Sequence, residues 1–113
     1  MNIDSELRGN AKLLILREAR IDAAGAMAFK EKVRTLIADH EGRVVLDMGQ
    51  VEFLDSSGLG ALVAVMKMLG RGRSLELAGC GAVVSKVLTL TRMDQVFVLH
   101  DDVETALAAR DAA

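Results

Sequence analysis

The sequence predicts an α/β fold, in which one domain holds a mixed, mostly parallel sheet of four to five strands with about four helices. The chain has 113 residues, which is the length of a single domain. Its apolar residues make up 51% of the chain and are almost all aliphatic, with no Trp or Tyr, and such cores are typical of parallel sheets that helices cover. Short apolar runs also alternate with longer segments of helical periodicity, which predicts parallel strands joined by helices.

The chain is expected to begin with a β-hairpin. Residues 12–17 read KLLILR, a short apolar run bounded by charges, which is typical of a buried strand. Residues 3–7 are expected to pair with this run as an antiparallel edge strand. Gly9 and Asn10 lie between the two segments and have the backbone freedom that a tight turn needs.

A first helix is expected over residues 22–40. The Asp22 carboxylate can accept hydrogen bonds from the first backbone amides of a helix, so we expect it to be the N-cap. Gly42 follows shortly after the last turn, where helices commonly stop. The apolar residues that form one stripe at helical spacing are Ala26, Phe29, Val33, Leu36 and Ile37.

A central strand and a second helix are expected in the middle of the chain. Residues 43–48 read RVVLDM, and their β-branched and aliphatic side chains favour a buried strand. After the short segment 51–54, the hexapeptide Asp55-Ser56-Ser57-Gly58-Leu59-Gly60 leads into a helix that ends near Leu69. The apolar positions of this helix repeat at three and four, and they are Leu59, Leu62, Val63, Met66 and Leu69.

The last third of the chain is expected to alternate in the same way. In order, the expected elements are a strand at 74–78, a helix at 82–91, a strand at 96–99 and a final helix capped by Asp101 or Asp102. In this interpretation the whole chain, residues 1–113, is one domain, and its tail at about 109–113 frays.

Composition and charge exclude several kinds of partner and cofactor. The net charge is −2 and both signs are interspersed, so no basic stripe is present to bind nucleic acid. The longest apolar run is far shorter than a bilayer span and the chain begins with polar residues, so we expect no membrane insertion and a cytoplasmic location. Cys80 is the one cysteine, and His40 and His100 are distant in sequence, so no disulfide, metal or other cofactor is expected.

The hexapeptide at 55–60 is the most informative segment. One interpretation is structural, because Asp and Ser are favoured N-cap residues and glycines let a helix pack closely on a sheet. The other interpretation is regulatory, because a serine hydroxyl at a helix N-terminus can carry a phosphate that the helix dipole tolerates. Such a phosphate would add about −1.5 to −2 of charge to a docking surface without unfolding the domain.

The segment 44–62, which contains this hexapeptide, resembles the STAS domain of bacterial anti-sigma factor antagonists. Arg20-Ile21-Asp22 is similar to the family's element before its first helix, and residues 83–97 are similar to its C-terminal helix and strand. The resemblance extends over nearly the whole chain. It implies the STAS fold and a protein that is not an enzyme.

The resemblance also implies a partner-switching mechanism. In that family, the unphosphorylated protein binds an anti-sigma factor that is also a serine kinase, and a sigma factor is thereby released. The kinase phosphorylates the serine that matches Ser56, binding is lost, and a serine phosphatase reverses the modification. The same match implies a partner-binding surface of Asp22, Asp55, Ser56, Ser57 and Gly58. Within it, Ser57 would be a cap or loop residue and Gly58 would permit the turn.

Three other functions compete with this one. An enzyme would use Ser56 or Ser57 as a nucleophile and one of the two histidines as a base, but the G-x-S-x-G context of a hydrolase is missing. Gly58 and Gly60 alone lack the full glycine fingerprint of a nucleotide site. A STAS adaptor that does not switch, in a lipid-transport complex or a signalling scaffold, is the third alternative and stays open.

Overall fold

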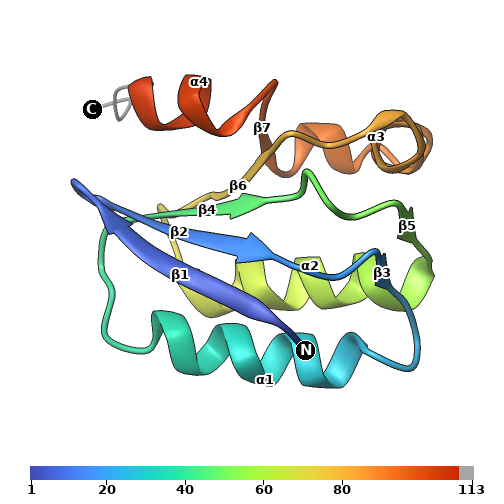
Figure 1. The fold of residues 1–113 in the computed structure, drawn as a ribbon, viewed down its shortest axis with the longest axis horizontal. Coiled ribbons are helices and arrows are strands. Elements are labelled where there is room, and N and C mark those ends of the chain that lie inside the picture. The colour runs from blue at the N-terminus through green and yellow to red at the C-terminus, as the bar shows by residue number, and fades with distance from the viewer. Residues whose placement is uncertain (110–113) are drawn as a thin grey trace.

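The computed structural model describes residues 1–109, so the predicted tail at about 109–113 lies almost wholly outside the described residues. The centre of the fold is a five-stranded sheet (Figure 1). In spatial order its strands are β1 (Ile3–Arg8), β2 (Ala11–Leu16), β4 (Arg43–Asp47), β6 (Leu75–Ala78) and β7 (Val98–His100). β1 and β2 are antiparallel, and every other neighbouring pair is parallel. The predicted α/β class with a mixed, mostly parallel sheet is therefore confirmed.

In the described part of the chain, four helices surround this sheet, and they are α1 (Ala26–Ile37), α2 (Ser56–Leu69), α3 (Ala82–Leu90) and α4 (Val103–Ala108). α1 and α2 lie side by side against one face, and α4 lies on the opposite face (Figure 1). α3 contacts β5 (Phe53–Leu54), and a short 3-10 helix, η1 (Met93–Gln95), connects α3 to β7. The molecule is thus layered, as expected where helices connect parallel strands.

The main core lies between the sheet and the paired helices α1 and α2. The sheet contributes Leu14, Leu16, Val44, Leu46, Leu75 and Leu77, all of them buried. From α1 the buried residues are Phe29, Val33 and Ile37, which belong to the predicted stripe. From α2 they are Gly58, Ala61, Leu62, Val65 and Leu69. Three residues of the predicted stripe of the second helix are only partly buried, and they are Leu59, Val63 and Met66.

A smaller apolar cluster lies on the other face of the sheet, beneath α4. Its buried members are Ala11, Leu13, Val45, Ala78 and Ala106. Because α4 has only six residues, its apolar contact with the sheet is small. A network of polar side chains also holds α4 against the sheet.

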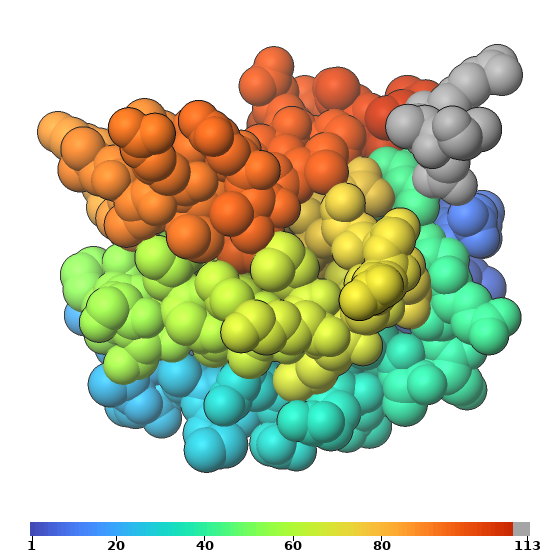
Figure 2. All heavy atoms as spheres, turned by 180° about the vertical axis from the view of Figure 1, so that it is seen from behind, coloured from blue at the N-terminus to red at the C-terminus, as the bar shows by residue number. Residues whose placement is uncertain are grey.

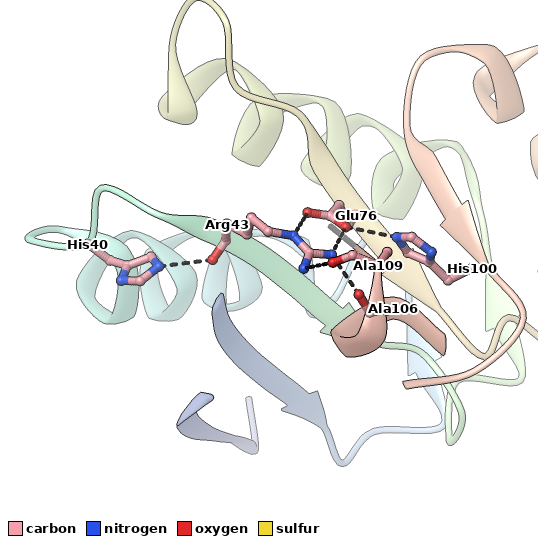
Figure 3. Close-up of polar contacts among 6 residues, drawn as sticks. All are labelled: His40, Arg43, Glu76, His100, Ala106 and Ala109. Carbon is pink, nitrogen blue, oxygen red and sulfur yellow. Dashed lines mark hydrogen bonds and ion pairs between the residues drawn. The ribbon is translucent and has the colours of Figure 1, made fainter. Parts of the chain in front are cut away.

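Arg43 on β4 connects α4 to the sheet (Figure 3). Its guanidinium donates to the backbone carbonyls of Ala106 at 2.7 Å and Ala109 at 3.0 Å, which are acceptors left open where a helix ends. The same guanidinium donates twice to the Glu76 carboxylate on β6, at 2.9 Å and 2.5 Å. His100 on β7 donates to Glu76 from Nε2 at 2.8 Å. Arg43 therefore holds α4 directly, and the buried Glu76 carboxylate connects Arg43 on β4 to His100 on β7.

The first helix differs from the prediction at both ends. α1 begins at Ala26 with no side-chain cap, so the predicted N-cap at Asp22 is wrong. Residues 22–25 form a turn instead, in which the Asp22 carbonyl accepts hydrogen bonds from the amides of Gly25 and Ala26. The helix also ends earlier than predicted, at Ile37.

Later elements keep the predicted order with shifted ends. The last strand is Val98–His100 rather than 96–99, because η1 and the turn after it occupy the segment before. His100 is thus a strand residue, and its side chain binds Glu76. Of the two predicted caps of the final helix, Asp102 is the one used, and its carboxylate accepts from the Thr105 amide at 2.7 Å.

Candidate functional site

A second, two-stranded sheet positions the start of α2. It pairs β3 (Arg20–Ile21) in parallel with β5, so that Arg20 lies opposite Phe53 and Ile21 opposite Leu54. Ile21 and Leu54 are buried, and the alternation of side chains along a strand places Arg20 and Phe53 on the outer face. The sequence pattern does not predict this sheet, because strands of two residues are too short to show a period.

Asp55 links this small sheet to the helix. It is the N-cap of α2, and its Oδ1 accepts a hydrogen bond from the Gly58 amide at 2.9 Å. Its Oδ2 accepts a second hydrogen bond, at 3.3 Å, from the amide of Ala23 in the loop after β3. The neighbouring Asp22 carboxylate accepts from Nε of Arg20 at 3.2 Å. One edge of the domain therefore brings together Asp22 and Asp55, two of the residues that the sequence singled out.

Ser56 and Ser57 are the first two residues of α2, and both are exposed. Ser56 follows the cap directly, so it lies at the positive end of the helix dipole. Ser57 belongs to the helix, and the cap is Asp55. The expected role of Ser57 as a cap or loop residue is therefore wrong.

Gly58 allows α2 to pack closely on a strand, as the structural interpretation of the hexapeptide predicts, and this packing rather than a turn requires the glycine. It lies in the first turn of α2, where a Cβ would come within 2.1 Å of the Ile21 carbonyl oxygen and 2.8 Å of a Leu54 methyl group. Only a residue without a side chain lets the helix approach β3 this closely. At Gly60, by contrast, a Cβ would meet no neighbouring atom of the described residues within 4 Å.

The outer side of α2 is an open surface. Figure 2 shows this helix on the rear of the molecule, between α1 and α3. At helical spacing, Ser56, Gly60 and Lys67 follow one another on the side away from the core, and all three are exposed. Ser56 thus stands on an exposed surface that another protein can cover.

The groups that an enzyme would use are engaged elsewhere. His40 donates to a backbone carbonyl at 2.9 Å and His100 to Glu76, so neither histidine is the hydrogen-bonding partner of Ser56 in this structure. Burial raises the pKa of the Cys80 thiol to about 11, so this thiol stays protonated at neutral pH. Over residues 1–109, no three His, Cys, Asp or Glu side chains gather as metal ligands would. Among the helices of the same range, none has the length and apolar character needed to cross a bilayer.

A cavity of about 560 Å³ lies at the opposite end of α2. Its lining residues come from the last turns of α1 and α2 and the segments that follow them, and they are Arg34, Ile37, Ala38, Asp39, His40, Glu41, Met68, Leu69 and Arg73. Because the whole length of α2 separates this cavity from Ser56, it is not part of the candidate site.

The family model of the STAS domain matches residues 2–106. Together with the layered fold and the serine at the start of α2, this match shows that the chain belongs to the STAS domain family. Similar proteins indicate which group within this family the chain belongs to. The anti-sigma-F factor antagonist RsfB of Mycobacterium tuberculosis is 31% identical over 87 residues, which cover 77% of this chain and 71% of RsfB. The chain thus groups with the anti-sigma factor antagonists of the family.

Solved structures show the same fold. An anti-sigma factor antagonist from Mycobacterium paratuberculosis is 27% identical with a TM-score of 0.79, and the match covers 94% of this chain and 90% of that one. The anti-sigma factor antagonist SpoIIAA in its unphosphorylated form has a TM-score of 0.71 at 20% identity, over 94% of this chain and 93% of its own. At that identity, the likeness to SpoIIAA shows the fold alone.

Two residues of the candidate surface, Arg20 and Phe53, are missing from the site that the sequence predicts. The signal for them is an alternation of outward and buried side chains in two short segments, Arg20-Ile21-Asp22 and Phe53-Leu54-Asp55. The sequence shows each segment, but only the pairing of β3 with β5 makes them one surface.

Proposed function

We propose that the unphosphorylated chain binds an anti-sigma factor that is also a serine kinase, so that a sigma factor is free to direct RNA polymerase. Phosphorylation of Ser56 ends this binding, and a serine phosphatase restores it. In this proposal the chain is a cytoplasmic regulatory protein without enzymatic activity of its own. The observation that carries the proposal is the exposed Ser56, placed directly after the Asp55 cap on the first turn of α2.

The position of Ser56 suits a phosphate. The start of a helix attracts negative charge, because the peptide dipoles point their positive ends there. Asp55 already holds the local backbone in place through its bonds to Gly58 and Ala23, so the modification has no need to reorganise the fold. The switch can therefore act at the surface while the domain stays folded.

The loss of binding follows from charge. Asp22 and Asp55 give this edge two carboxylates before any modification, and the Asp22 side chain is 27% exposed. A phosphate on Ser56 would add about −1.5 to −2 of charge and three acceptor oxygens. A partner surface shaped for a neutral hydroxyl and two carboxylates would meet repulsion and would have to desolvate the new charge. The relative SpoIIAA, which shares the fold, has been solved both unphosphorylated and phosphorylated.

The experiment uses the purified chain, the anti-sigma factor serine kinase of the same cell, and ATP. Mass spectrometry should locate one phosphate on Ser56. Ser56→Ala should accept none, and the matched control Ser57→Ala, one residue further along the same exposed turn, should be modified like the wild type. Phosphate found on Ser57 or elsewhere would contradict the assignment.

Binding is measured with ADP in place of ATP, by titration calorimetry. The wild type and Ser56→Ala should bind the kinase alike, because the alanine adds no charge to the surface. Ser56→Asp should bind at least about 100-fold more weakly, which corresponds to about 2.7 kcal/mol. The adaptor alternative makes a different prediction, since a STAS domain that does not switch would keep its partner when Ser56 is changed to Asp.

A further inference from the structure

Arg20 is held in a defined position on the outer face of the two-stranded sheet. Its guanidinium carbon lies 4.2 Å from the centre of the Phe53 ring, which faces it across the strand pair. Its Nε donates to Oδ2 of Asp22 at 3.2 Å. The Arg20 side chain is nonetheless 60% exposed, so the structure orders a cation and leaves much of it open to solvent.

The Arg20 side chain is thus preorganised for binding. A surface arginine ordinarily samples many rotamers, and ordering it costs entropy when a partner binds. The ring of Phe53 and the carboxylate of Asp22 hold Arg20 from two sides, through a cation–π contact and an ion pair. The planar guanidinium has five N–H donors, and only Nε is needed for the bond to Asp22. Further donors therefore remain available for a planar acceptor such as a carboxylate.

Arg20 also changes the charge pattern of the candidate surface. Asp22 and Asp55 are acidic, and Ser56 is neutral until it is phosphorylated. Arg20 contacts Asp22 and Phe53, and the Asp55 carboxylate accepts from the amide of Ala23, the residue after Asp22, so the face that carries Arg20 borders both carboxylates. The face thus presents a cation beside two carboxylates, and a complementary partner has to offer an acid beside basic or donor groups.

We propose that Arg20, supported by Phe53, is a specificity residue of the docking surface and binds an acidic side chain of the kinase partner. This inference rests on the proposed function, because it takes the partner to be the anti-sigma factor serine kinase. It adds the chemistry of the contact, namely a carboxylate of the partner against the guanidinium of Arg20. A phosphate on Ser56 would place its negative charge on the same docking surface as that carboxylate, which helps to explain the release of the partner.

A structural role for Arg20 is the competing explanation, and the chain offers a matched control for it. Arg34 on α1 is also 60% exposed and also forms an ion pair through Nε, with Glu31 at 3.6 Å. Exposed pairs of this kind add little to stability. Arg20→Glu and Arg34→Glu should therefore both fold with melting temperatures near that of the wild type.

The experiment measures the dissociation constant of each variant for the purified kinase in the presence of ADP. Arg20→Glu should weaken binding by about 30-fold or more, Arg20→Lys by a few fold because the planar fork is lost, and Arg34→Glu by less than about twofold. Raising the salt concentration should weaken the wild type more than Arg20→Gln, since one ion pair with the partner is missing in that variant.

Two further measurements test the contact itself. Phe53→Leu should weaken binding in the wild type but have little effect in the Arg20→Gln background, because the ring acts through the arginine. Charge reversal of one acidic residue on the kinase should restore binding to Arg20→Glu.

The outcomes separate the two proposals. If Arg20→Glu binds like the wild type while Ser56→Asp does not bind, the inference about Arg20 is overturned and the proposed function stands. If additive effects of Phe53→Leu and Arg20→Gln are found, the support of Arg20 by the ring is overturned. If the wild type itself does not bind the kinase, the proposed function fails and the inference falls with it.

Discussion

A Cβ on Gly58 would lie 2.1 Å from the carbonyl oxygen of Ile21. The first turn of α2 therefore rests on the backbone of β3, and the two segments that carry Ser56 and Asp22 are in direct contact. This contact sets how the serine, the two aspartates and Arg20 lie relative to one another. The candidate site is thus a consequence of one close approach between a helix and a short strand.

Gly58→Ala should lower the free energy of unfolding by about 3 kcal/mol, because the new methyl group overlaps a backbone atom that cannot rotate away. Urea denaturation followed by circular dichroism measures the change. Gly60→Ala is the matched control, two residues further along the same helix in open space. It should raise the free energy of unfolding by about 0.5–1 kcal/mol, as an exposed Gly→Ala change inside a helix does. Equal effects of the two changes would contradict the packing that we describe.

Asp55→Ala should cost more stability than removal of an ordinary helix cap. Its carboxylate accepts from the Gly58 amide within α2 and from the Ala23 amide across the site. The matched control is Asp102→Ala at α4, where the carboxylate accepts from the Thr105 amide. We expect a loss of about 1 kcal/mol for Asp102→Ala and about 2 kcal/mol for Asp55→Ala, measured by the same urea titration. If Asp55→Ala lost no more stability than Asp102→Ala, the hydrogen bond from the Ala23 amide would contribute nothing to the stability of the fold.

Glu76→Gln should destabilise the domain by about 2–3 kcal/mol at neutral pH. The change keeps the shape of the side chain but removes the negative charge that faces Arg43 and His100, both of them largely buried. Hydrogen exchange provides a second measurement. The amides of α4 should exchange faster in the variant, because the Arg43 that holds its terminal carbonyls loses its own support. Unchanged exchange in α4 would contradict the role that we assign to this network.

The stability of the wild type should also depend on pH through Glu76. Burial alone would raise the pKa of this carboxyl, but the hydrogen bonds and charges of Arg43 and His100 outweigh burial and hold the pKa below its ordinary value. A carboxyl whose pKa is lower in the folded than in the unfolded state stabilises the fold above the unfolded pKa, which is about 4.3 for Glu. This contribution is lost as the pH falls through the folded pKa.

The measurement is a series of urea titrations between about pH 6 and the lowest pH at which the protein folds. The free energy of unfolding should fall with decreasing pH in the wild type, and the decrease should be smaller in Glu76→Gln. If the free energy of unfolding fell equally with pH in the wild type and in Glu76→Gln, Glu76 would not be the source of the pH dependence.

The order of the main elements and the position of the serine could be predicted from the sequence because both depend on local patterns. Apolar runs, helical spacing and the hexapeptide at 55–60 are properties of neighbouring residues. The ends of α1 are different, since Asp22 is a good N-cap by composition yet pairs with Arg20 in a turn. The Asp22 carboxylate could cap a helix or pair with Arg20. Which partner it binds depends on the neighbouring segments, and the rest of the fold determines where those segments lie.

The sequence by itself determined the fold class, the family and the serine that we propose as the switch, because these follow from residue types and their spacing along the chain. Only the tertiary structure decided which side chains share a surface with that serine. Arg20 and Phe53 are far apart in sequence and meet because β3 pairs with β5. Likewise, Arg43, Glu76 and His100 come from three strands and meet beneath α4. Such contacts depend on strand order and register, which long-range packing sets, and no local pattern records them.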